Sequence, residues 1–380
     1  MSNPAIRDVS LHHVRVTGKT VWSFVAVTLD DGTTGWGEAT IPRPALLDAP
    51  AASAAAAWTG KPLDELMSHA AAQAGAPLPD AAIASALEQA AWDALGRVRG
   101  CRTVDLAAEL VGPVVRESVT LYGNMNRRTV DRTPTGFHAS ARETVAAGFS
   151  AVKIAPFDDV TPENLSTPAG RAHLVAGMAR IAAVREAIGP DVGLYVDCHW
   201  RLTAGVAEDL LDELAQLGVS WFECPLPETE AAIQPLRLLR GEANLRGIRL
   251  AGLESLTSPD AFRPWLAAGA YDVVMPDVKY AGGIRGVVQV AGLAARHGAA
   301  CAPHNPTGPV CHAASLAACA LAPAAELLEC QYDETPRFWE LAGETLPRIV
   351  NGASAVPRGA GLGMVLQLPP ADETPGARAS

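Results

Sequence analysis

From about residue 118 onward, short β-branched or apolar runs alternate with stretches of helical periodicity. This alternation constrains the fold most strongly, because parallel strands need a crossover between them, usually a helix. The predicted strands occupy residues 118–122, 151–154, 193–196, 221–222, 249–251, 273–275, 299–302 and 327–328. The predicted helices between them include residues 170–188, 204–217, 231–240, 259–268 and 284–297.

Eight strands of this kind favour an α/β fold of the (β/α)8 TIM-like barrel type. An open doubly wound sheet normally carries a glycine-rich phosphate loop after its first strand. No G-x-G-x-x-G or Walker A motif follows any predicted strand. We therefore expect a barrel over residues 116–335.

The first 115 residues have a different pattern. Residues 21–29 and 33–38 are strand-like and flank an Asp-Asp-Gly turn, which is typical of a hairpin. Alanine-rich stretches at 45–76 and 83–100 have helical spacing. We expect residues 1–115 to form a separate α+β domain, followed after the barrel by a C-terminal segment, residues 336–380.

The charge balance limits the partners of the chain. Its net charge is −11, with 41 acidic and 30 basic residues, which argues against nucleic acid and anionic membrane surfaces as partners. The longest apolar run, residues 312–326, contains a proline and is too short to span a bilayer. Seven cysteines without a C-x-x-C motif, and no apolar segment in residues 1–13, favour a cytoplasmic protein with free thiols.

Acidic residues end three consecutive predicted strands: Asp197, Glu223 and Glu254. Chemistry in a barrel lies at these strand ends, and adjacent strands are roughly 4.8 Å apart, so the three carboxylates would converge and repel one another. A hard divalent cation with oxygen ligands relieves this repulsion, and carboxylates plus waters suit Mg²⁺. The alternative is three separate, solvated loop acids.

His304 follows the seventh predicted strand, and Asp277 follows the sixth. A carboxylate that holds one imidazole nitrogen fixes the tautomer and raises the basicity of the ring, as a general base requires. His199 lies two residues after Asp197. For any single histidine, the alternative is a core or surface residue without a chemical role.

Two more charged residues lie at strand positions. Lys153, in the second strand, is a candidate second base or contact for a substrate carboxylate, and the alternative is a structural salt bridge. Glu329, at the eighth strand, would donate a proton if acidic surroundings kept it protonated, and the alternative is again a salt bridge. Lys279, two residues after Asp277, has no clear role from the sequence.

Together these motifs resemble the enolase superfamily, in its mandelate racemase/muconate lactonizing branch. The similar segments span nearly the whole chain in the right order. They read VAVTLDDGTTGWGE at 25–38, ALEQAAWDALGRVRG at 86–100, VDCHWR at 196–201, ECP at 223–225, AGLES at 251–255, MPDVKYAGG at 275–283, APHNPTGP at 302–309 and PRGAGLG at 357–363.

The resemblance implies an N-terminal capping domain, completed by the C-terminal tail, closed over the barrel. It implies Mg²⁺ on the three carboxylates, a base dyad of His304 with Asp277, and Glu329 as an electrophilic or hydrogen-bonding group. A Lys or His base with Mg²⁺ on an ene-diolate is a general property of the superfamily, carried over here with the resemblance. Substrate specificity would lie in capping loops around residues 40–47 and near Trp22, and we expect a small-molecule carboxylate substrate and a homo-oligomer.

The Asp-x-His pattern at Asp197 and His199 resembles acid-sugar dehydratases of the galactonate and gluconate type. There the histidine protonates the departing β-hydroxyl, and the product is a 2-keto-3-deoxy acid. Lys153-Ile154-Ala155 departs from the Lys-x-Lys of many branch members, and Lys279 is also unexpected. A lysine facing His304 would instead support a racemase, epimerase or cycloisomerase. A catalytically silent barrel acting as a binding protein is the third hypothesis.

Overall fold

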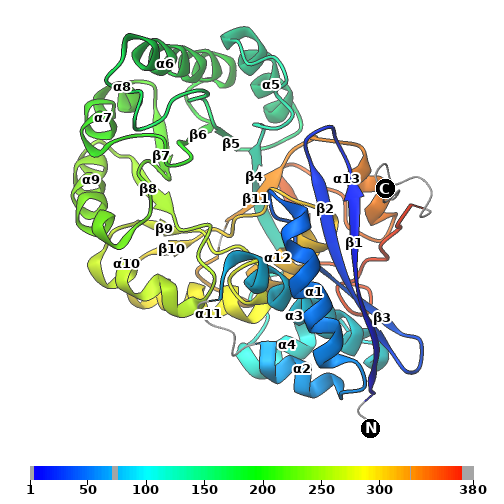
Figure 1. Cartoon of the computed structure of the whole chain (residues 1–380). Helices are drawn as coiled ribbons and strands as arrows, with labels where there is room; N and C mark the ends of the chain where they lie inside the picture. Colours follow the sequence, from blue (N-terminus) through cyan, green and yellow to red (C-terminus); the bar gives the residue numbers. More distant parts are fainter. Residues whose placement is uncertain (1–3, 71–75, 326, 370–380) are drawn as a thin grey trace, which may run out of the picture.

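The strand–helix alternation folds into a ring of eight parallel strands with helices outside it (Figure 1). The computed structural model describes residues 4–70, 76–325 and 327–369. Around the ring the strand order is β10-β9-β8-β7-β6-β5-β4-β11. The strands are β4 (Ser118–Asn124), β5 (Ala151–Ile154), β6 (Gly193–Asp197), β7 (Val219–Glu223), β8 (Arg249–Gly252), β9 (Val273–Val274), β10 (Ala300–Cys301) and β11 (Leu327–Gln331).

The predicted barrel is confirmed as a nearly closed one. Between β10 and β11, the described residues form a single parallel bridge, Cys301 to Ala325. On its other side β11 pairs with β4 from Leu327 to Gln331, beyond the predicted end of the strand. Glu329 therefore lies within β11, because pairing with β4 continues past the apolar run that marks the strand in the sequence.

The barrel helices agree with the prediction in part. The helix predicted at 204–217 is two helices that meet at Leu210, and the helices that begin at Pro134 and Pro309 were not predicted. The second of these is entirely buried, so it has no polar face and no amphipathic period to detect. The helices are α5 (Pro134–Ala146), α6 (Pro168–Ile188), α7 (Ala204–Asp209), α8 (Leu211–Gln216), α9 (Ile233–Leu245), α10 (Arg263–Ala268), α11 (Gly283–Arg296) and α12 (Pro309–Leu321).

The N-terminal residues form a three-stranded antiparallel sheet covered by helices. The predicted hairpin is confirmed, and a preceding strand, β1, was missed. Gly35 and Gly37 have a packing role, because a Cβ at either would lie within about 2 Å of the backbone of the longest covering helix. The elements are β1 (Ile6–Arg15), β2 (Val21–Leu29), β3 (Thr34–Glu38), α1 (Asp48–Trp58), α2 (Leu63–Ala70), α3 (Leu78–Arg99) and α4 (Thr103–Val111).

The C-terminal segment returns to both parts of the molecule. It contains α13 (Arg337–Ala342) and β12 (Ala353–Ala355), and β12 pairs antiparallel with β4 of the barrel. Farther along, Leu362 N donates to Asp93 Oδ1 of α3, and Arg97 Nη2 of α3 donates to Met364 O. The tail therefore completes the N-terminal domain, as the resemblance implies, while the limits drawn at 115 and 335 stay predictions.

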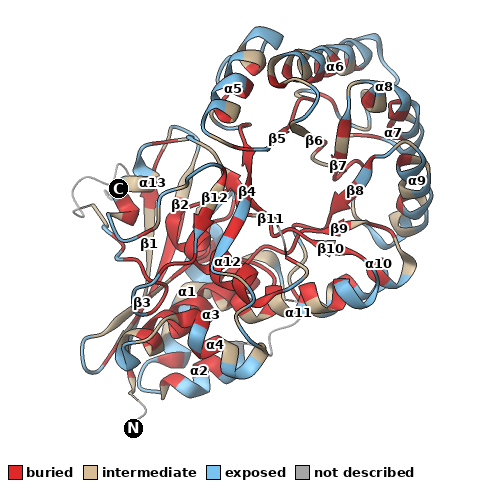
Figure 2. Ribbon diagram, turned by 180° about the vertical axis from the view of Figure 1, so that it is seen from behind, coloured by how far each residue is buried: buried red, intermediate tan, exposed pale blue. Residues whose placement is uncertain are grey.

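Burial follows this architecture. Figure 2 shows exposed residues on the outer faces of the barrel helices, whereas the barrel strands, α3 and α12 are largely buried. All seven cysteines are unpaired. Within the described ranges, no helix is both long and apolar enough to cross a membrane.

Two buried glutamates of the N-terminal domain cap barrel helices. Glu38 accepts from Gly308 N and Cys311 N, both at 2.9 Å, at the start of α12. Glu88 accepts from Ile284 N at 2.8 Å and Arg285 N at 3.2 Å, at the start of α11. A carboxylate satisfies the free N–H groups and the positive dipole end of a helix. The N-terminal domain thereby holds the two helices that follow β9 and β10.

The raised pKa of Glu88 predicts that the stability of the fold depends on pH. Burial raises its pKa from 4.5 to about 7, against three hydrogen-bond donors that lower it. The folded state therefore binds this proton more tightly than the unfolded state, so stability is full below pH 4.5 and falls as pH rises through 7. We expect up to about 3 kcal/mol of this loss between pH 5 and 8. In Glu88→Gln, which cannot ionise, denaturant unfolding should show a flatter pH dependence; an unchanged slope would contradict this assignment.

Candidate active site

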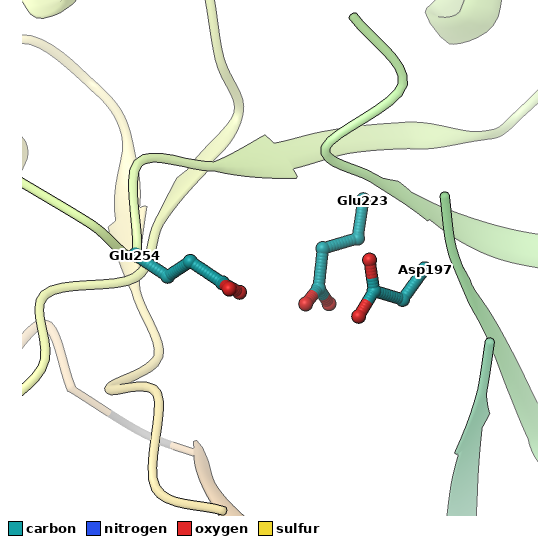
Figure 3. A group of neighbouring side chains, drawn as sticks. All are labelled: Asp197, Glu223 and Glu254. Atoms are coloured by element: carbon teal, nitrogen blue, oxygen red, sulfur yellow. The ribbon is translucent and has the colours of Figure 1, made fainter. Parts of the chain in front are cut away.

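Three acidic side chains converge at the ends of β6, β7 and β8. Asp197 and Glu223 are the last residues of their strands, and Glu254 follows β8 by two residues. Figure 3 shows the carboxylates of Asp197 and Glu223 side by side, with that of Glu254 pointing toward them. One oxygen from each lies within 4.8 Å of the others, and all three residues are buried. The structure thus brings the predicted metal ligands together.

The electrostatics of this trio call for a cation. Glu223 Oε2 and Glu254 Oε2 are buried without a hydrogen-bond partner in the described chain. Burial, together with repulsion from neighbouring carboxylates, raises the pKa of both glutamates well above the usual value. Burial also acts on Asp197, but the nearby His199 and Lys153 together outweigh it and lower the pKa to about 2. Three crowded carboxylates with unpartnered oxygens fit a hard divalent metal ion.

The backbone beside these ligands is strained. Four residues have φ values in the left-handed region that residues other than glycine rarely adopt. They are His199 at 47°, Trp200 at 59°, Cys224 at 44° and Leu253 at 75°. Each costs of order 1 kcal/mol or more. Hydrogen bonds between neighbouring strand ends hold this geometry, such as Trp200 N to Cys224 O at 2.7 Å.

His304 and Asp277 form the predicted dyad. The imidazole Nδ1 lies 2.7 Å from Asp277 Oδ2. The opposite nitrogen, Nε2, lies 3.5 Å from Glu254 Oε2 and 3.9 Å from Glu329 Oε2. The ring edge that carries Nε2 is therefore directed at the carboxylate trio, as a base at that site requires.

Lys279 is the counterion of the dyad carboxylate. Its side chain is fully buried, and its Nζ lies 2.6 Å from the same Asp277 oxygen that His304 contacts. Burial opposes ionisation of Asp277, but the adjacent Lys279 ammonium and His304 together outweigh it and lower the pKa of this carboxyl. The lysine that the sequence left without a role thus keeps Asp277 charged and fixed.

Lys153 and Glu329 form an ion pair within the barrel. Lys153 Nζ lies 2.6 Å from Glu223 Oε1 and 2.8 Å from Glu329 Oε1. Burial disfavours the ammonium, but these carboxylates outweigh it and raise the pKa of Lys153 well above its usual value. Burial likewise raises the pKa of Glu329, and Lys153 outweighs it and lowers that pKa. Both residues thus match the salt-bridge alternative, because Lys153 lies between Glu223 and Glu329 and pairs with both.

Two asparagines complete the environment of Glu329. Asn124 Nδ2 donates to its Oε1 at 2.6 Å, and Asn305 N donates to its Oε2 at 3.1 Å. Asn124 and Asn305 each belong to a strand end that the sequence marks as polar. Three donor contacts from Lys153 and the asparagines account for a buried, ionised glutamate.

His199 lies at the edge of the trio. Its Nε2 contacts Asp197 Oδ2 at 2.9 Å, and 38% of the side chain is exposed. Its Nδ1 has no hydrogen-bond partner among the residues described here. His199, Asp197, Glu254 and His304 all line one cleft of about 1280 Å³.

Both parts of the molecule contribute to this cleft. The N-terminal domain contributes residues 17–21 and the loop at 40–44, part of the region expected to set specificity. Trp22 itself is buried and does not line the cleft, because β2 turns its side chain into the domain core. Beyond the metal ligands and the residues around the dyad, the charged lining is mostly basic: Lys19, Arg127, Arg132, Arg180 and Arg201 against Asp158, Asp159 and Glu334. A chain of net charge −11 thus presents a locally positive cleft, which attracts anions.

Glu228 is a supporting residue that the sequence analysis missed. Its Oε1 accepts from Leu253 N at 2.7 Å and from Tyr271 Oη at 2.8 Å. It therefore holds the strained Leu253, which immediately precedes the ligand Glu254. Glu228 comes after strand β7, and only its position behind the rigid Pro225-Leu226-Pro227 marks it in the sequence.

We expect Glu228 to control metal affinity. Groups that orient metal ligands typically change affinity by about tenfold to a hundredfold when removed. Glu228→Leu, which deletes the acceptor, should weaken Mg²⁺ binding by this amount in isothermal titration. Glu228→Gln keeps an oxygen for Leu253 N and should bind nearly as tightly as the native chain. If Glu228→Leu bound Mg²⁺ as tightly as the native chain, this role of Glu228 would be contradicted.

Two family models match this chain. The model of the mandelate racemase/muconate lactonizing enzyme N-terminal domain matches residues 5–108, and the "enolase C-terminal domain-like" model matches residues 136–369. The chain belongs to the mandelate racemase/muconate lactonizing branch of the enolase superfamily. Superfamily members bind a divalent metal, and the buried trio of this chain could hold one.

Curated relatives and solved structures agree with this membership. A D-gluconate dehydratase from Thermoproteus tenax is 31% identical over 287 residues, which cover 74% of this chain but only about half, 54%, of that protein. A D-galactonate dehydratase from Ralstonia pickettii is 30% identical over 302 residues, 78% of this chain and 74% of that protein. A mandelate racemase/muconate lactonizing enzyme from Jannaschia sp. superposes with a TM-score of 0.81 at 26% identity, covering 95% of each chain. One from Sulfitobacter sp. gives 0.82 at 25% identity, covering 96% of this chain and 93% of that one.

Proposed function

We propose that this protein is a Mg²⁺-dependent dehydratase of a sugar acid, an aldonate or an aldarate. The observation that carries the proposal is the position of His304 Nε2, 3.5 Å from Glu254 and directed at the carboxylate trio. A proton α to a carboxylate is weakly acidic, so its removal needs a positioned base and strong stabilisation of the developing negative charge. The dehydratase names of two curated relatives support the same reaction class.

Asp197, Glu223 and Glu254 would hold the metal ion. Bound there, it would supply Lewis-acid stabilisation of the substrate carboxylate as negative charge develops. Lys153 balances the charge of Glu223 on the inner side of the site. The proton transfers would be carried out by side chains of the protein.

In the first step His304 Nε2 takes the proton from the α-carbon. The electron pair of the C–H bond moves toward the carboxylate and gives an enediolate. Asp277 accepts from Nδ1 and stabilises the imidazolium that forms, and Lys279 keeps Asp277 fixed.

In the second step the enediolate expels the β-hydroxyl. The C–O bond breaks as His199 protonates the leaving oxygen, so one water leaves. The resulting enol tautomerises to a 2-keto-3-deoxy acid. His199 lies in the cleft beside Asp197, where it would meet a hydroxyl next to the reacting carbon.

The ion pairs of Lys153 favour dehydration over racemisation or epimerisation. A second base on the opposite face of the substrate would have to be neutral. Lys153 is held between two carboxylates that raise its pKa, which leaves it as a cation. An ammonium group cannot accept a proton, so Lys153 balances the charge of Glu223 and Glu329 and does not act as a base.

The decisive experiment is a panel of sugar monoacids and diacids with added Mg²⁺. Dehydration produces a 2-keto acid that reacts with semicarbazide, and EDTA should abolish it. Epimerisation would instead exchange the α-hydrogen in D₂O without forming a keto acid. No turnover and no Mg²⁺ binding would favour the silent, binding-protein hypothesis.

We expect two histidine variants to separate the steps. His304→Asn should lose both α-hydrogen exchange and keto-acid formation, by about a thousandfold or more for the loss of a base. His199→Asn should retain α-hydrogen exchange and lose keto-acid formation. His297→Asn, an exposed histidine outside the cleft, serves as the control. Full dehydration by His199→Asn would contradict its role as the acid.

A further inference from the structure

Three arginines line the cleft over consecutive strand ends. Arg132 belongs to the loop after β4, Arg180 to α6, and Arg201 to the loop after β6. They surround Asp158, which follows β5. Arg132 contacts this carboxylate with two nitrogens, at 2.8 and 2.9 Å, and Arg180 Nη1 lies 3.3 Å from it.

The charges in this cluster do not balance. Partial burial raises the pKa of Asp158, but the hydrogen bonds from Arg132 and the positive charges of the three arginines together outweigh it and lower the pKa, so this carboxylate is ionised. Three guanidinium groups therefore face one half-buried anion. Even with the exposed Asp159 beside it, one positive charge remains.

Backbone carbonyls hold the arginines without neutralising them. Arg180 donates to Arg132 O at 2.7 Å and to Pro156 O at 2.5 Å. Arg201 Nη1 donates to Phe157 O at 3.0 Å and Val160 O at 3.3 Å. In the described chain, Arg201 Nε and Nη2 and Arg180 Nη2 have no hydrogen-bond partner, and none of them is buried. The guanidinium groups are thus fixed in place with N–H groups left for a ligand.

The cluster adjoins the reaction centre on the side of His199. Arg201 follows His199 by two residues in the same turn. On the other flank, Arg132 Nη1 donates to Asn126 Oδ1 at 2.9 Å, and Asn126 N donates to Asn124 Oδ1 at 2.9 Å. Asn124 in turn donates to Glu329. The three arginines line the same cleft as His199 and His304, so a substrate that reacts at the two histidines has the arginines on the wall of its own cleft.

We propose that Arg132, Arg180 and Arg201 form a second anion subsite that binds the distal carboxylate of a sugar diacid. The inference rests on the proposed function and narrows its substrate to the aldarate class. A planar guanidinium with free N–H groups recognises carboxylates through paired, charge-assisted hydrogen bonds. The terminal CH₂OH of an aldonate is neutral, so it cannot compensate the remaining positive charge of the arginine cluster. A terminal phosphate shares the same chemistry, so the test includes it.

The test compares kcat/KM for a sugar diacid, the monoacid of the same configuration, and its terminally phosphorylated form. The native chain should prefer the diacid by about tenfold or more, the scale of one charge-assisted contact. Arg201→Met should lower kcat/KM for the diacid by roughly that factor and leave the monoacid within about twofold. Arg185→Met is the matched control, because Arg185 lies on α6, donates to the carbonyls of Leu217 and Gly218, and does not line the cleft.

The outcomes separate this inference from the proposed function. If the monoacid is dehydrated as well as the diacid, or if Arg201→Met lowers both equally, the subsite is overturned and the dehydratase stands. A preference for the phosphorylated acid overturns the diacid assignment. If no acid is dehydrated, the proposed function itself fails.

A second measurement needs no variant and so does not depend on folding. Adipate should inhibit the native enzyme at least about tenfold more tightly than hexanoate, and the difference should shrink as salt concentration rises. Equal inhibition by these two acids would overturn the subsite.

Discussion

The crowding of negative charge at the ends of β6, β7 and β8 is the constraint on which the rest of this structure depends. Three buried carboxylates meet there with two unpartnered oxygens, an arrangement that is costly without a cation. Lys153 on the inner side and His199 at the edge compensate for part of this charge. Strained backbone at four neighbouring positions is tolerated because inter-strand hydrogen bonds and Glu228 hold it.

The opposite side of the site depends on the N-terminal domain. Asp277 and His304 lie just before α11 and α12, and Glu88 and Glu38 of the N-terminal domain cap those two helices. The helices that follow Asp277 and His304 are therefore held by the N-terminal domain. The acidic trio thus comes from one part of the ring, and His304 with Asp277 from another.

Several roles were inaccessible from the sequence because they depend on contacts between loops. Lys153 and Glu329 were candidates for proton transfer, yet their mutual ion pair is visible only when β5 and β11 are placed on one ring. Lys279 acquires its role from a single Asp277 oxygen that it shares with His304. Strand β1 and helices α5 and α12 were missed, and the complete burial of α12 removed the amphipathic period that would have revealed it.

The sequence by itself determined the barrel, and it placed the three acids and the pair of His304 and Asp277 at strand ends. It did so because parallel strands end at one face of a barrel, so a polar residue at a strand end is already placed to within a few ångströms. Tertiary structure alone decided which charges pair, which domain clamps which helix, and where three arginines gather. Those outcomes depend on distances between segments far apart in the chain, and local periodicity carries no information about such distances.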